Sequence, residues 1–103
     1  MALDFCQIDD SGTNTSVSTP IHVQQHGHLI HTASSLRLDL VLRMSDYYDD
    51  VVYEVADLPR LAAQLARIAA ELAPNKLAGT AVAMRDVVLD SIAKNLRVEA
   101  IAD

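Results

Sequence analysis

The amino-acid sequence predicts an α+β domain, and three observations carry this prediction. Segments with strand character open and close the chain, two long segments with helical spacing fill its second half, and turn signals separate them. The predicted order, ββ-α(α)-β-αα-β, favours a mostly antiparallel sheet of about four strands packed on one face by three to four helices. A chain of 103 residues has the length of one domain, so residues 1–103 are expected to form a single globular unit.

The N-terminal segments predict a β-hairpin. Leu3–Ile8 has the character of a short strand, and residues 9–14 form a turn cluster in which Gly12 can adopt a positive φ. Pro20 places the second strand at an edge of the sheet, because proline has no N–H to donate to a neighbouring strand. This second strand alternates, with one face made by Val17, Thr19, Ile21 and Val23.

The segment from Gln25 to Met44 fits two patterns. Residues 36–43 place a leucine at every second position, as a half-buried strand would, but their leucines and arginines favour a helix. The sequence leaves helix and strand open for residues 36–43, and it favours two short helices or one broken helix over the whole segment. Val51–Val55, rich in valine and tyrosine, is typical of a short strand.

A long helix is predicted after Asp57, which is expected to cap it. Pro59 falls in the first turn, where a missing N–H costs nothing, and Pro74-Asn75 ends the helix. The apolar residues follow helical spacing on one face, and Gln64 is expected on the opposite, polar face.

A second helix is predicted from about Lys76 to Asn95, and a last strand over Leu96–Ala102. Their apolar positions complete an aliphatic core with the earlier elements. The predicted core contains Val17, Ile21, Leu61, Leu65, Val88, Ile92 and Val98.

The charge is unevenly distributed along the chain. The net charge is -6, with seven acidic and two basic residues in 1–50 against seven and six in 51–103. The acidic residues concentrate at Asp9-Asp10 and at Asp46–Asp50. Such a surface repels nucleic acid and anionic membranes and attracts basic proteins, so we expect a protein partner, with no direct binding of nucleic acid or membrane.

The chain has one cysteine, Cys6, which rules out an internal disulfide and a cysteine-based zinc site. The N-terminal residues show neither a basic region nor a long apolar run, and no segment approaches the length of a membrane span. The expected location is therefore the cytoplasm.

Four histidines, His22, His26, His28 and His31, lie within ten residues of one another. Imidazole is a common metal ligand, so a zinc or nickel site is conceivable. No regular helix or strand directs three of these side chains to one point, and the spacing of metalloprotease ligands is absent. We therefore expect surface histidines without a metal or other cofactor, and the sequence assigns them no role.

No catalytic motif is recognisable in the sequence. There is no Gly-x-Ser-x-Gly elbow, and the three glycines are isolated, so a glycine-rich phosphate loop is absent. Neighbouring carboxylates, as in Asp49-Asp50, point in different directions on any regular element. The chain is expected to have no enzymatic activity.

The segment Ser45–Asp50 is the strongest candidate for partner binding. It combines Asp46, Tyr47, Tyr48, Asp49 and Asp50 between regular elements, and Asp9 with Asp10 offers a second acidic patch. Tyrosine provides contact area at a low entropic cost, and carboxylates pair with arginine and lysine. The alternative is a charged loop whose tyrosines pack onto the core.

Several segments resemble small bacterial immunity proteins of polymorphic toxin systems, particularly those of contact-dependent growth inhibition. They are Met1–Phe5, Met44–Val55, Asp57–Leu61 and Val98–Asp103. The resemblance implies a cytoplasmic protein without catalysis that occludes the active site of a cognate toxin. Such toxins are often nucleases, whose basic groove an acidic inhibitor can fill as a phosphate mimic. The four histidines are not part of this resemblance.

Three functions are thus to be compared. The first is an immunity protein that binds and neutralises a toxin, expected to be a nuclease with a basic surface. The second is another protein-binding module, such as a secretion chaperone, an adaptor or an antitoxin. The third is a small metal-dependent enzyme that uses the histidines.

Overall fold

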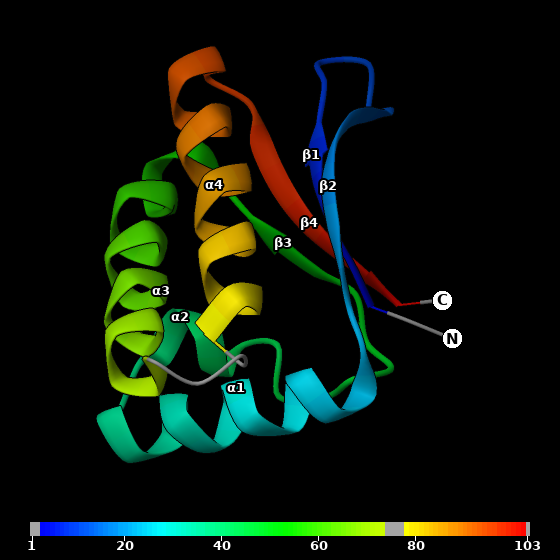
Figure 1. Cartoon of the computed structure of the whole chain (residues 1–103). Helices are drawn as coiled ribbons and strands as arrows, with labels where there is room; N and C mark the ends of the chain where they lie inside the picture. The colour runs from blue at the N-terminus through cyan, green and yellow to red at the C-terminus, as the bar shows by residue number, and fades with distance from the viewer. Residues whose placement is uncertain (1–2, 74–77, 103) are drawn as a thin grey trace.

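The computed structural model describes residues 3–73 and 78–102, and it confirms the α+β architecture. Its four strands form one antiparallel sheet in the order β2-β1-β4-β3, and helices cover one face of it (Figure 1). The strands are β1 (Leu3–Ile8), β2 (Asn14–Ile21), β3 (Val51–Tyr53) and β4 (Arg97–Ala102).

The described helices follow the predicted order. They are α1 (Val23–Leu36), α2 (Asp39–Leu42), α3 (Leu58–Leu72) and α4 (Ala78–Lys94), with a short 3₁₀ turn, η1 (Val55–Asp57), before α3. Helices α3 and α4 form an antiparallel pair on the sheet, and α1 crosses below them (Figure 1). The predicted break at Pro74-Asn75 and the predicted helix start at Lys76 lie outside the described residues.

The last strand occupies a central place in the sheet. β4 pairs antiparallel with β1 on one side, where Ala102 faces Leu3, and with β3 on the other, where Val98 faces Tyr53. β2 pairs with β1 and forms the opposite edge, as Pro20 predicts.

One residue of the predicted second strand lies elsewhere. The alternation of β2 holds up to Ile21, but Val23 belongs to the first turn of α1 and is 61% exposed. The helix begins because the side-chain oxygen of Gln25 accepts the backbone N–H of His22 at 2.9 Å. An apolar alternation alone does not reveal this change of direction.

Residues 36–43 contain the end of α1, a break at Arg37 and Leu38, and α2, so the strand alternative is wrong and the prediction of two helices is confirmed. Arg37 ends α1 in the left-handed conformation, with φ 57°. The N–H of the next residue, Leu38, donates to the carbonyl of Ala33 at 2.9 Å, which completes a helix-ending turn that glycine usually supplies. A four-residue helix, α2, follows at once.

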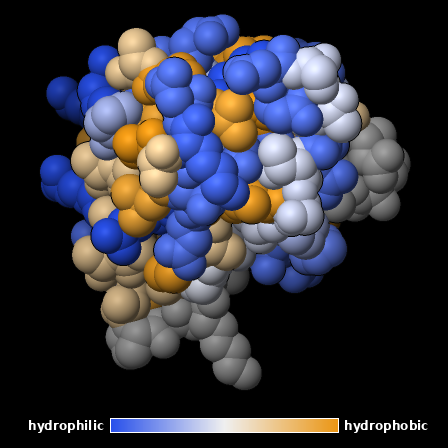
Figure 2. Space-filling view, turned by 90° about the horizontal axis from the view of Figure 1, so that it is seen from above, coloured by the Kyte–Doolittle hydropathy of each residue, from blue (hydrophilic) through white to orange (hydrophobic). Residues whose placement is uncertain are grey.

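The core is mainly aliphatic, with Phe5 and Tyr53 among its largest members, and lies between the sheet and the helices. Among its predicted members, Val17 and Ile92 are half-buried against it, and five are buried: Ile21, Leu61, Leu65, Val88 and Val98. Apolar residues also reach the surface, and Figure 2, a view from above, shows them mostly on the left, the side of α3 and α4. None of the described helices has the length and apolar character needed to cross a membrane.

Three local predictions around α3 are wrong. β3 ends at Tyr53, because the next residues turn into η1. The Asp57 side chain makes no capping hydrogen bond, since this residue already has helical dihedral angles at the end of η1. Gln64 is buried, with 8% of its surface exposed, because it contacts α2. Pro59 does lie in the first turn of α3, as predicted.

Candidate functional site

The acidic and aromatic loop Ser45–Asp50 connects α2 to β3. It begins where α2 ends, as the N–H groups of Met44 and Ser45 donate to the carbonyls of Val41 and Leu42, both at 3.0 Å. The Met44 side chain is fully buried and fixes the start of the loop to the core. The loop therefore starts from residues that are packed into the core and hydrogen-bonded to α2.

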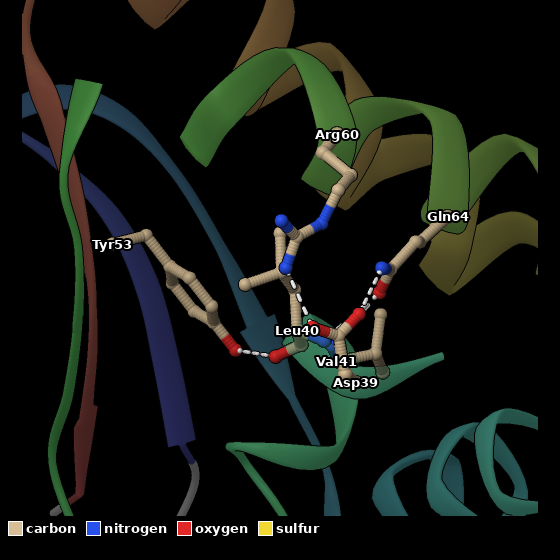
Figure 3. Close-up of polar contacts among 6 residues, drawn as sticks. All are labelled: Asp39, Leu40, Val41, Tyr53, Arg60 and Gln64. Carbon is tan, nitrogen blue, oxygen red and sulfur yellow. Dashed lines mark hydrogen bonds and ion pairs between the residues drawn. The ribbon is translucent and has the colours of Figure 1, made fainter. Parts of the chain in front are cut away.

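Helix α2 itself is held by α3 through a polar cluster (Figure 3). The side-chain oxygen of Gln64 accepts the N–H groups of Leu40 and Val41 at 3.1 and 3.2 Å, and its amide nitrogen donates to Asp39 at 2.8 Å. Arg60 forms an ion pair with the same carboxylate. The hydrogen bond from Gln64, reinforced by Arg60, lowers the pKa of Asp39.

Helix α2 is also tied to the sheet. The hydroxyl of Tyr53, a fully buried residue of β3, donates to the carbonyl of Leu40 at 2.6 Å (Figure 3). Burial raises the pKa of the Tyr53 hydroxyl, so it stays protonated as a donor. The element that precedes the loop thus bonds to both layers of the fold.

Tyr47 anchors the middle of the loop. Its ring is half-buried against the core, and its hydroxyl donates to the carbonyl of Ile21 at 3.0 Å. The ring of His26 lies edge-on at 4.9 Å between centroids. Tyr47 therefore packs onto the core, which is the alternative to partner binding that the sequence left open for the loop tyrosines.

His26 is the histidine that supports the loop. It is 7% exposed, and its Nε2 lies 2.6 Å from the carbonyl oxygen of Met44. Because a carbonyl only accepts, Nε2 must carry the proton. The bond joins α1 to the base of the loop, and nothing in the pattern of residues distinguishes this histidine from the other three.

Tyr48 is the exposed one of the two tyrosines in the loop. Its side chain is 67% exposed, and its ring stands edge-on against Tyr47, with 5.5 Å between centroids. Its backbone N–H donates to the Asp46 carboxylate at 2.9 Å, and the N–H of Asp49 donates to the Asp46 carbonyl at 3.3 Å. The loop thus presents one aromatic ring on a braced backbone.

The acids of the loop divide into two kinds. Asp46 and Asp49 are exposed, and neither forms an ion pair within the described part of the chain. Asp50 accepts the backbone N–H of Ala102 at 2.7 Å, and this bond secures the end of β4. All three side chains are exposed, and the Asp50 carboxylate is the one of them that is bonded to another strand.

The second acidic patch shapes the turn between β1 and β2. The carboxylate of Asp9 accepts hydrogen bonds from the backbone N–H groups of Ser11 and Thr13 at 3.0 and 2.9 Å, and from the Ser11 hydroxyl at 2.6 Å. These bonds lower the pKa of Asp9. Gly12 provides the positive φ of 84° that the turn requires. Asp10 is exposed beside it.

The two acidic groups do not form one surface. Asp50 bonds to Ala102, which faces Leu3 at the start of β1, whereas Asp9 follows Ile8 at its end. The length of β1 separates them, roughly 17 Å at the usual rise of a strand. In Figure 1 the turn of the hairpin is at the top and the loop before β3 is at the bottom.

The four histidines do not converge. His26 points into the protein, while His28 and His31 are exposed on α1 and His22 is exposed just before it. Over residues 3–73 and 78–102, no group of three or more histidine, cysteine, aspartate or glutamate side chains is arranged to hold a metal ion.

A shallow groove of about 290 Å³ lies where β2, α1 and α4 meet. Sequence reasoning did not predict it, because its walls come from three separate parts of the chain. Its lining residues include no acid, lysine or arginine, and they are Thr19, Pro20, His22, Gln25, Gly79, Thr80 and Ala83.

Comparisons with known proteins do not supply a family for this fold and loop. The chain matches no protein-family model, no curated protein and no solved structure at a significant level.

Proposed function

We propose that this chain is a cytoplasmic immunity protein that binds a cognate toxin domain, a nuclease with a basic groove, and occludes its active site without catalysis of its own. The observation that carries the proposal is the exposure of Tyr48 between the exposed side chains of Asp46 and Asp49. An aromatic ring flanked by acids suits a surface rich in arginine and lysine.

The geometry narrows the candidate residues of the interface. Asp9 and Asp50 use their carboxylates to hold the hairpin turn and the end of β4, and Tyr47 is committed to the core. Tyr48 and Asp49 remain available to a partner, and Asp46 stays exposed although its carboxylate accepts the Tyr48 N–H. Asp10 is exposed but lies at the far end of the sheet, so it can contribute to attraction at a distance rather than to the same contact.

The bracing of the loop favours tight binding. A loop that is already held in place loses little conformational entropy when a partner docks on it. The braces are Tyr47, His26 and the Asp46 carboxylate, whose hydrogen bonds fix the loop at three points. Binding energy can then concentrate in a few contacts made by Tyr48 and the two acids.

The test uses the C-terminal domain encoded by the reading frame immediately upstream, once that domain is shown to be toxic. The affinity of the double variant Asp46→Ala, Asp49→Ala for it is compared with that of the parent protein. If either carboxylate is desolvated against an arginine, its loss should cost about 2–5 kcal/mol, or roughly 30-fold or more in Kd. Protection of cells from the toxin should fall in parallel, and association should slow as salt is raised.

The matched control is the double variant Glu71→Ala, Asp86→Ala. Both side chains are exposed on helices, and their removal changes the net charge by the same amount. A loss of affinity in both double variants would indicate long-range attraction alone. Unchanged affinity in a well-folded Asp46→Ala, Asp49→Ala protein would place the interface elsewhere, for example on the helical face around Arg60 and Arg67.

A further inference from the structure

One face of the sheet is covered by the helices, and no described helix lies on the other (Figure 1). The strand pairing identifies the residues of this open face, because directly paired residues point to the same side and successive residues alternate. Phe5 and Ala100 pair with each other and belong to the core. Asp4 and its partner Ile101, each adjacent to one of them, therefore lie on the open face.

Asp4 occupies the middle of a row that crosses this face at the end of the sheet nearest the acidic loop. It pairs with Pro20 of β2 on one side and with Ile101 of β4 on the other. The pairing of β3 with β4, continued by one residue, sets Asp50 opposite Ile101, and the Asp50 carboxylate accepts the N–H of Ala102. The open face is thus continuous with the end of the loop.

The open face carries negative charge that the described strands do not balance. Their one cation, Arg97, pairs with Glu99 of the same strand at 3.1 Å. Asp4 is exposed and forms no ion pair among residues 3–73 and 78–102. A protein surface that complements this face therefore has to bring positive charge to Asp4.

The surroundings of Asp4 suit a charge pair that loses its water on binding. The exposed ring of Pro20 and the half-buried side chain of Ile101 flank it in its row. Apolar neighbours of this kind exclude water once a partner lies on them, and anchors enclosed in this way dominate the energy of an interface. Asp10 has no such flanks, because it lies between Asp9 and Ser11 in the hairpin turn.

We propose that Asp4 is an anchor of the toxin interface, which receives a basic side chain of the toxin domain while Pro20 and Ile101 exclude water from the pair. This inference rests on the proposed function and extends its contact from the loop to the open face of the sheet. An enclosed charge pair acts on how long a complex lasts, whereas exposed charges act mainly on how fast it forms. Asp4 should therefore govern dissociation.

The experiment measures association and dissociation rates by surface plasmon resonance, with the same upstream-encoded toxin domain. Asp4→Asn keeps the size of the side chain and removes its charge. It should weaken binding roughly 30-fold or more, mainly through faster dissociation. The loss should persist at high salt, because an enclosed pair is screened much less than an exposed one. Ile101→Thr keeps a branched side chain in the strand and should weaken binding about threefold or more.

The matched control is Asp10→Asn, which removes the same charge from an exposed residue of the turn that follows β1. Its dissociation rate should stay within about twofold of that of the parent protein. Circular dichroism verifies that each variant is folded.

The outcomes separate this inference from the proposed function. An Asp4→Asn protein that dissociates no faster than Asp10→Asn overturns the inference. If the double variant Asp46→Ala, Asp49→Ala still loses affinity in that case, the proposed function stands with the loop as its contact. A parent protein that does not bind the toxin domain overturns both.

Discussion

Replacing Gln64 by alanine tests how α3 holds the short helix that leads into the loop. The side chain is 8% exposed, and its oxygen is the acceptor for the N–H groups of Leu40 and Val41. These two groups belong to the first turn of α2, where a helix has no acceptor of its own to offer. Alanine leaves both donors without their partner and also removes the bond to Asp39.

The magnitude follows from these contacts. Loss of a capping side chain costs about 0.5–2 kcal/mol, and a buried donor left without an acceptor costs about 1–3 kcal/mol. Two donors are affected, and water can partly reach them after truncation, so the free energy of unfolding should fall by about 2–4 kcal/mol. For a domain of this size, the melting temperature should fall by roughly 10–20 °C.

Urea unfolding followed by circular dichroism measures this change. The control is Arg67→Ala, which truncates an exposed residue of the same helix and should stay within about 0.5 kcal/mol of the parent protein. A Gln64→Ala protein that is destabilised no more than the control would refute the argument that this side chain holds α2.

Other predictions concern the core, the carboxylates and the thiol. Leu65→Ala should lower the free energy of unfolding by about 2–5 kcal/mol in the same assay, because the side chain is fully buried, and a smaller loss would contradict its place in the core. Folding lowers the pKa values of Asp9, Asp39 and Asp90 through hydrogen bonds. The donors to Asp90 are Lys94, which has the larger effect, and Gln7. Their contribution to stability is therefore present above the unfolded pKa of about 4 and is lost as the pH falls below it, which urea titrations between pH 3 and 7 can follow. Burial, with Asp4 and Glu99 nearby, raises the pKa of the Cys6 thiol, so the native protein should react with a thiol reagent far more slowly than the urea-unfolded chain.

The periodicity of apolar residues predicted most of the fold. It works because alternation and helical spacing report which face of an element is buried, and Leu61, Leu65 and Val98 are buried for that reason. The periodicity gives the wrong face where a polar side chain is buried because it hydrogen-bonds to another element. Gln64 has the spacing of an exposed residue, but α2 needs an acceptor at its first turn, and that need is visible only in three dimensions.

The candidate site was predicted only in composition. The acids and tyrosines of the loop Ser45–Asp50 identify it in the sequence. They do not show which of Tyr47 and Tyr48 is half-buried, because that depends on the contacts of Tyr47 with the Ile21 carbonyl and the His26 ring. Nor could the sequence place Asp9 relative to Asp46, because that distance depends on the direction of β1. Hairpin pairing has local signals, whereas the insertion of β4 between β1 and β3 has none.

The central position of β4 has a consequence for how the protein is made. The β1–β2 hairpin and the pair of helices α3 and α4 each consist of neighbours in sequence, and they can form while synthesis continues. β1 and β3, however, have no contact as strands until Arg97–Ala102 enters between them. A nascent chain that has not yet exposed these residues holds a two-stranded hairpin with an open edge and a separate three-residue segment, β3, without a strand partner. The complete sheet, and with it the Asp50–Ala102 bond that ties the loop to β4, therefore forms only after Arg97–Ala102 has left the ribosome.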